Sequence, residues 1–95
     1  MPIYELHLFN KNEVALVPPA AGVFVLYQLE NAILAEGASD LRKSLRAALK
    51  RFPAATHFAT EALPGSEVAR RVQKLKEELS RVRVSTFMGV LPGAR

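Results

Sequence analysis

The order of apolar and polar residues predicts a strand, a tight turn and a second strand in the first half of the chain. Between Gly22 and Leu29 both faces are apolar, which predicts a strand buried on both sides and covered by helices. One face has Val23, Val25, Tyr27 and Leu29, and the other has Phe24 and Leu26. Glu30-Asn31 predicts the turn, and Ala32 to Ala35 predicts the partner strand. Glu36-Gly37 is expected to end that strand, with the glycine providing backbone freedom.

Two later segments repeat their apolar residues with a helical period. The first is expected to start after an N-cap at Ser39 or Asp40 and to stop at Pro53. The second is expected from about Glu67 to Arg81 and, with only two heptads, to pack on the sheet and form no coiled coil. The apolar positions are Leu41, Leu45, Ala48, Leu49 and Phe52 in the first helix and Val68, Val72, Leu75, Leu79 and Val82 in the second.

The remaining segments predict further strands around this core. Ile3 to Phe9 alternates and predicts an N-terminal strand, followed by a turn cluster at residues 10–12 and an extended piece from Val14 to Val17. Thr56 to Ala62 predicts a third core strand, and Arg83 to Leu91 an edge strand or a crossing to a partner subunit. Together these segments predict one α+β domain over residues 1–95. It has a small sheet of three or more strands, flanked by two main helices in a β-β-α-β-α core with extra N-terminal and C-terminal strands.

Positive charge is concentrated in the first predicted helix. The chain has a net charge of +4, and residues 41–60 carry five cations and no acid, so the remaining residues sum to −1. The five cations are Arg42, Lys43, Arg46, Lys50 and Arg51. They are either a solvated helix face or a patch for a phosphate-bearing or acidic partner. Because they lie off the apolar stripe, replacing Arg42, Lys43 and Arg46 by Ala is expected to leave the fold intact.

Composition limits the compartment and the chemistry that can be expected. The absence of cysteine excludes disulfides and thiolate metal sites, and it fits a cytoplasmic location. The apolar run from Val14 to Tyr27 is interrupted by Pro18-Pro19 and is too short to span a bilayer, and the N-terminus lacks the pattern of a signal peptide. No membrane association is therefore expected.

No residue pattern predicts an active site. His7 lacks co-ligands nearby and is expected to be structural or incidental. The other candidate acid, base or metal groups are His57, Glu61, Glu36 and Asp40. His57 and Glu61 share a strand face about 13 Å apart, at 3.3 Å per residue, so they cannot form a site by themselves.

Five segments follow one another in the order of a known nuclease domain. They are Pro19 to Tyr27, Ile33 to Gly37, Ser39 to Leu45, Thr56 to Glu61 and the helix from Glu67. They resemble the GIY-YIG nuclease superfamily, in which a strand with Gly-Ile-Tyr turns into one with Tyr-Ile-Gly before an Arg- and Lys-rich helix. The resemblance covers roughly residues 18–80 and implies a GIY-YIG-like core over about residues 18–82.

The working positions of that family are not matched. Its members use two motif tyrosines, an arginine on the first helix and a glutamate that binds one divalent metal. The corresponding positions here are Phe24, then Leu34 or Ala35, then Ser44, then Val72 or Gln73. None supplies a phenol, a guanidinium or a carboxylate. The resemblance therefore implies a degenerate nuclease domain with no catalytic residue, no metal ligand and no cofactor.

Two non-catalytic functions follow from these expectations. In the favoured one, the basic first helix binds DNA or RNA through phosphate contacts that depend strongly on salt. In the alternative, the domain is a protein-interaction or homodimerisation module, using the C-terminal segment and the second helix, and its basic patch meets an acidic protein. An active metal-dependent endonuclease is the least favoured of the alternatives.

Overall fold

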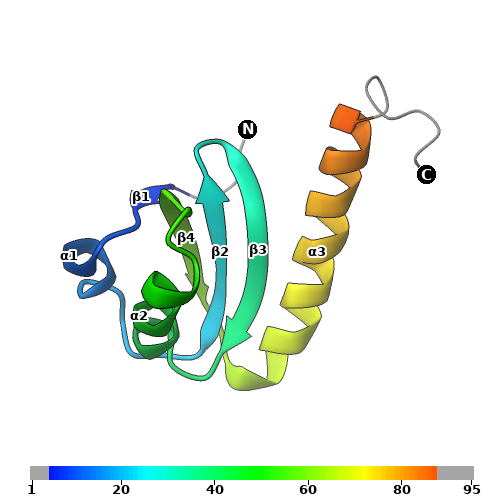
Figure 1. Cartoon of the computed structure of the whole chain (residues 1–95). Helices are drawn as coiled ribbons and strands as arrows, with labels where there is room; N and C mark the ends of the chain where they lie inside the picture. Colours follow the sequence, from blue (N-terminus) through cyan, green and yellow to red (C-terminus); the bar gives the residue numbers. More distant parts are fainter. Residues whose placement is uncertain (1–4, 88–95) are drawn as a thin grey trace.

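The chain forms an α+β fold with one antiparallel sheet between two layers of helices (Figure 1). The computed structural model describes residues 5–87, with side chains up to residue 79. The elements in chain order are β1 (His7–Leu8), α1 (Lys11–Val14), β2 (Gly22–Gln28), β3 (Asn31–Ala38), α2 (Leu41–Arg51), β4 (His57–Ala62) and α3 (Gly65–Phe87). The predicted fold class is confirmed.

The sheet is organised around β2, as the sequence predicts. Its order is β1-β4-β2-β3, and each neighbouring pair is antiparallel. The six residues from Gly22 to Tyr27 are all buried. β2 and β3 are joined by a two-residue turn in which Leu29 has a positive φ of 57°. The Leu29 N–H donates to the Thr56 hydroxyl oxygen at 2.6 Å, which ties this turn to the start of β4.

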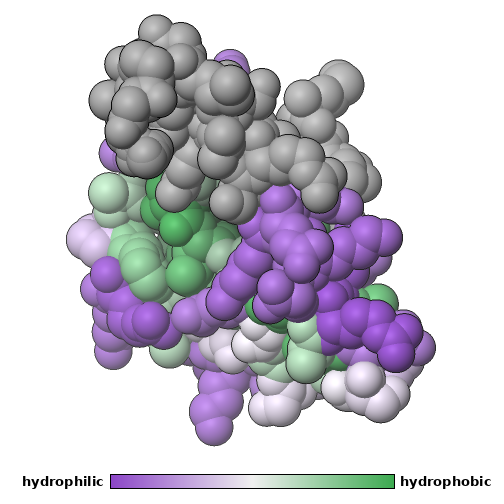
Figure 2. All heavy atoms as spheres, turned by 90° about the vertical axis from the view of Figure 1, so that its right-hand side faces the viewer, coloured by the Kyte–Doolittle hydropathy of each residue, from purple (hydrophilic) through white to green (hydrophobic). Residues whose placement is uncertain are grey.

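The helices cover opposite faces of the sheet (Figure 1). α1 and α2 pack on the face that carries Phe24, Leu26 and Phe58. α3 packs on the face that carries Val23, Val25 and other residues of a second cluster. Figure 2 looks onto the α3 side and shows hydrophilic side chains across its middle, with hydrophobic surface beside them. Each face of β2 therefore has its own core.

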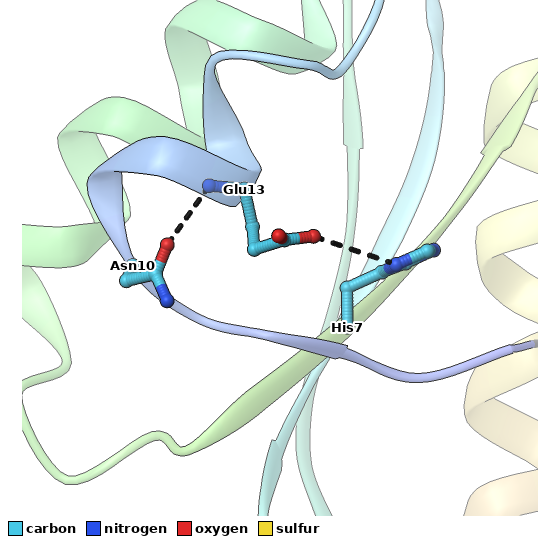
Figure 3. Close-up of polar contacts among 3 residues, drawn as sticks. All are labelled: His7, Asn10 and Glu13. Carbon is cyan, nitrogen blue, oxygen red and sulfur yellow. Dashed lines mark hydrogen bonds and ion pairs between the residues drawn. The ribbon is translucent and has the colours of Figure 1, made fainter.

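The N-terminal prediction is wrong in two respects. Among the described residues the first strand is confined to His7–Leu8, and residues 1–4 lie outside them. Residues 11–14 form a short helix, where the sequence predicted a turn and an extended piece. The reason is local capping, because the Asn10 side chain accepts a hydrogen bond from the Glu13 N–H at 2.8 Å (Figure 3). Burial of Val14 and Val17 then holds this turn of helix against α2.

The same capping region holds His7. A Glu13 carboxylate oxygen lies 3.8 Å from His7 Nδ1 (Figure 3). The imidazole also packs against Phe58 with 5.5 Å between ring centroids. Both contacts join β1 to its surroundings, which agrees with the structural role expected for His7.

β3 is longer than predicted, and Gly37 has a different role from the one expected. The strand continues through Ala38, and no glycine among the described residues has a positive φ. A Cβ added at Gly37 would overlap Val68 Cγ1 and lie 3.1 Å from Val72 Cγ2, so these side chains or α3 itself would have to shift. The missing side chain thus permits close packing of α3 on β3, and backbone freedom is not involved.

α3 is also longer than predicted, and it includes residues that the sequence assigned to a strand. Residues 83–87, expected to begin an edge strand, are the last residues of this helix. No Gly or Pro interrupts the sequence from Glu67 to Phe87, so the helix propagates through the β-branched residues once it has formed. The rest of the predicted strand, residues 88–91, lies outside the described residues. Val68, Val72, Leu75 and Leu79 pack on the sheet as predicted.

Candidate functional site

The basic residues are positioned by the way α2 is fixed to the sheet. The Asp40 side chain caps the helix by accepting from the Lys43 N–H at 3.0 Å. Leu41, Leu45 and Ala48 are buried in the core on that face. With 3.6 residues per turn, this buried stripe determines which residues of α2 face outwards.

Three of the five cations form one row on the exposed side of α2. Lys43, Arg46 and Lys50 are exposed and follow the i, i+3, i+7 spacing of a single helix face. That face is opposite the buried stripe, and α2 contains no acidic residue. We call these three residues the basic stripe. At a rise of 1.5 Å per residue the stripe is about 10 Å long.

Arg42 is not part of this stripe. It lies on the flank of α2, half-buried, and its Nε donates to the Val17 carbonyl oxygen at 2.7 Å. This bond joins α2 to the segment between α1 and β2. The sequence grouped Arg42 with the other four cations and gave no sign of this bond, because the backbone carbonyl that accepts it is 25 residues away.

Arg51 is held on the opposite flank of α2. Its Nη2 lies 3.8 Å from a Glu36 carboxylate oxygen on β3. Its guanidinium carbon lies 4.9 Å from the centroid of the Phe52 ring, a cation–π distance. The structure therefore brings Lys43, Arg46 and Lys50 together and gives Arg42 and Arg51 partners within the fold.

The positions that resemble nuclease catalytic residues are not gathered in one place. Phe24 is 1% exposed and lies in the core under α2, on the same sheet face as Leu34. Ala35 and Val72 lie on the other face, in the core under α3. The sheet separates the two sets. Ser44 is on α2 and Gln73 on the exposed side of α3.

The other candidate polar groups each have a local partner. His57 Nδ1 lies 2.8 Å from the Thr56 hydroxyl oxygen, and Asp40 caps α2. Glu61 accepts from Arg71 Nε at 2.7 Å, a contact between β4 and α3 that the sequence did not predict. No sequence signal identifies it, because the pair forms only when α3 packs on the sheet. Within residues 5–79, whose side chains are described, no three His, Asp or Glu residues are grouped so as to hold a metal ion.

Comparisons with known proteins add no assignment for this surface. The chain matches no protein-family model, no curated protein and no solved structure. Its resemblance to GIY-YIG nucleases therefore stays a prediction based on the segments quoted above. In the part of the chain that the structure describes, no helix has the length and apolar character needed to cross a bilayer.

Proposed function

We propose that this domain binds nucleic acid through the exposed face of α2 and does not cleave it. The observation that carries the proposal is the basic stripe of Lys43, Arg46 and Lys50 on a helix without acids. Its buried opposite side fixes the helix, so the three side chains project from a rigid support. Clustered cations of this kind neutralise phosphates and release the counterions condensed on nucleic acid.

The order of elements supports the same proposal. From β2 onwards the chain runs strand, strand, helix, strand, helix, and the helix after the first two strands is the basic one. This is the order that the resemblance implies for a nuclease domain. Because one fold can serve many unrelated functions, the basic stripe and not the topology carries the proposal.

The absence of cleavage is proposed from the residues at the matched positions. Cleavage of a phosphodiester needs groups that activate water, stabilise developing charge and assist the leaving oxygen. Phe24, Leu34 and Val72 cannot do this, and they lie in two separate cores.

We also propose that the domain is cytoplasmic, on the ground that the chain has no cysteine.

The test is a binding titration with labelled duplex, branched and single-stranded DNA and RNA, with and without Mg²⁺ or Mn²⁺. The full chain is compared with the triple variant Lys43→Ala, Arg46→Ala, Lys50→Ala. The control is the triple variant Arg70→Ala, Lys74→Ala, Lys76→Ala, which removes three exposed cations from α3 on the other side of the sheet. We expect the first variant to lose binding and the second to retain it. Equal losses would mean that only net charge matters, and metal-dependent cleavage would contradict the non-catalytic part.

A second candidate function, an assembly module, is favoured by a different observation. β3 is an edge of the described sheet. Ile33 in this strand is 38% exposed, and Leu29 in the turn before it is 65% exposed. Exposed strand edges with apolar neighbours are sites of pairing between chains. The apolar side of α3, which the sequence offered for dimerisation, already packs on the sheet. Sedimentation of the native chain and of Ile33→Lys tests this candidate, which predicts a dimer that the variant dissociates.

A further inference from the structure

We propose that the ligand of the basic stripe is one sugar–phosphate strand of a double-stranded nucleic acid, held by three ionic contacts without base recognition. This inference rests on the proposed function and specifies its ligand. It differs from the expectation of five phosphate contacts that the sequence alone suggests.

Three phosphate contacts are expected because the other two cations of α2, Arg42 and Arg51, already have partners within the fold. Arg42 already donates to the Val17 carbonyl oxygen, and moving its guanidinium to a phosphate would leave that acceptor without its donor. Arg51 lies beside the Glu36 carboxylate and over the Phe52 ring, on the opposite flank from Arg42. Lys43, Arg46 and Lys50 are exposed, and among the described side chains each has no competing carboxylate within ion-pair distance.

The single strand of phosphates follows from the shape of the stripe. Its three residues lie in one row along the helix, about 10 Å from end to end. In this proposal each cation of the single row pairs with one phosphate of the same strand, which gives three contacts. A second row of cations on α2, which contact across a groove would need, is not present, since Arg42 and Arg51 stand singly on the two flanks.

The preference for a duplex follows from the chemistry of the exposed face. Proteins that hold single strands add aromatic side chains on which the bases stack. The exposed residues of α2 are Lys43, Arg46, Ala47, Lys50 and Arg51, and none is aromatic, so this face offers no surface on which bases can stack. Lys and Arg can also bind guanine, and in this proposal the three cations of the basic stripe bind phosphates instead. The nearby Phe52 is half-buried, with the Arg51 guanidinium over its ring. Without base stacking to favour a single strand, charge density favours a duplex, which has the higher density of phosphates.

The experiment is a salt titration of the full chain with a duplex and a single strand of equal length. Three contacts predict a slope of about −2.7 for log K against log salt on a duplex, and about −2.1 on a single strand. Between about 50 and 200 mM salt the duplex affinity should fall about 40-fold, whereas five contacts would give about 500-fold. Tighter binding of the duplex is expected at each salt concentration.

The outcomes separate this inference from the proposed function. A slope near −4.5 would overturn the three-contact ligand, and tighter binding of the single strand would overturn the duplex. Absence of binding to either probe at low salt would instead overturn the proposed function itself. As a further check, Arg46→Ala should reduce the slope by about 0.9, whereas Arg51→Ala should leave it unchanged. A reduced slope in Arg51→Ala would also contradict the inference.

Discussion

The Arg42 guanidinium is joined to the Val17 carbonyl oxygen by a hydrogen bond of 2.7 Å. This bond connects the outer helix layer to the chain that leads into the central strand, since Val17 is buried and precedes β2 by a few residues. Arg42 is therefore a structural residue, although it has the charge and the helix position of a ligand-binding one.

Arg42→Ala should lower the free energy of unfolding by about 1 to 2 kcal/mol, because a partly buried acceptor loses a charged donor. Lys43→Ala and Arg46→Ala are controls on the same helix, and each should change stability by less than about 0.5 kcal/mol. Urea unfolding followed by circular dichroism measures the three variants. The triple replacement of Arg42, Lys43 and Arg46, which is expected to leave the fold intact, should therefore lose stability mainly through Arg42. If Arg42→Ala unfolds at the same urea concentration as the parent, the hydrogen bond has no structural role.

The close packing of α3 on β3 gives a second prediction. Gly37→Ala would place a methyl group against Val68 and Val72, and overpacking of this kind costs about 1 to 3 kcal/mol. Gly65→Ala is the matched control, because nothing lies within 4 Å of a Cβ added at the start of α3. It should leave stability unchanged or raise it by up to about 1 kcal/mol. Thermal unfolding measures the Tm of both variants, and that of Gly37→Ala should be the lower. Equal Tm values would show that α3 does not approach β3 as closely as described.

The elements that the sequence predicted well are those specified by their own residues. β2 is apolar on both faces, and α2 has a cap at Asp40, a buried stripe and a stop at Pro53. The four-residue helix α1 is too short to show a helical period, so only its Asn10 cap could have indicated it. The end of α3 was missed because Val84 and Thr86 favour strands, while helix propagation depends on the residues before them.

The candidate site was predictable in position but not in composition. The cations of α2 and the apolar stripe opposite them follow from the helical period alone. Which cations are available depends on partners that are distant in sequence, Val17 for Arg42 and Glu36 for Arg51. A one-dimensional pattern contains no information on these contacts. For the same reason, the pairing of Glu61 with Arg71 could not be read from their spacing.

Tyr27 predicts how stability depends on pH in the alkaline range. Its side chain is 6% exposed at the end of β2, and this burial raises the pKa of the Tyr27 phenol above its ordinary value of 10.0. Below pH 10 the phenol is neutral in both the folded and the unfolded chain, so its burial contributes fully to the free energy of unfolding. Above pH 10 the unfolded chain loses the proton first, and the free energy of unfolding falls until the folded phenol also ionises. Native Tyr27 and Tyr27→Phe, compared by urea unfolding across this range, should diverge above pH 10, and parallel curves would contradict the raised pKa.

The contact between Glu36 and Arg51 predicts a variant that gains affinity. Glu36→Gln removes the carboxylate 3.8 Å from Arg51 Nη2, so the guanidinium becomes free to reach a fourth phosphate. The salt slope on a duplex should become steeper by about 0.9, from about −2.7 to about −3.6.

The matched control for this gain is Glu67→Gln. It makes the same change in net charge, but on the first turn of α3 across the sheet from α2. It should raise affinity slightly at low salt without changing the slope, because a distant charge alters attraction but adds no phosphate contact. Fluorescence anisotropy with one labelled duplex measures both variants. If Glu36→Gln and Glu67→Gln give the same slope, Arg51 is not restrained by Glu36, and the number of phosphate contacts is not determined by the partners that the fold provides.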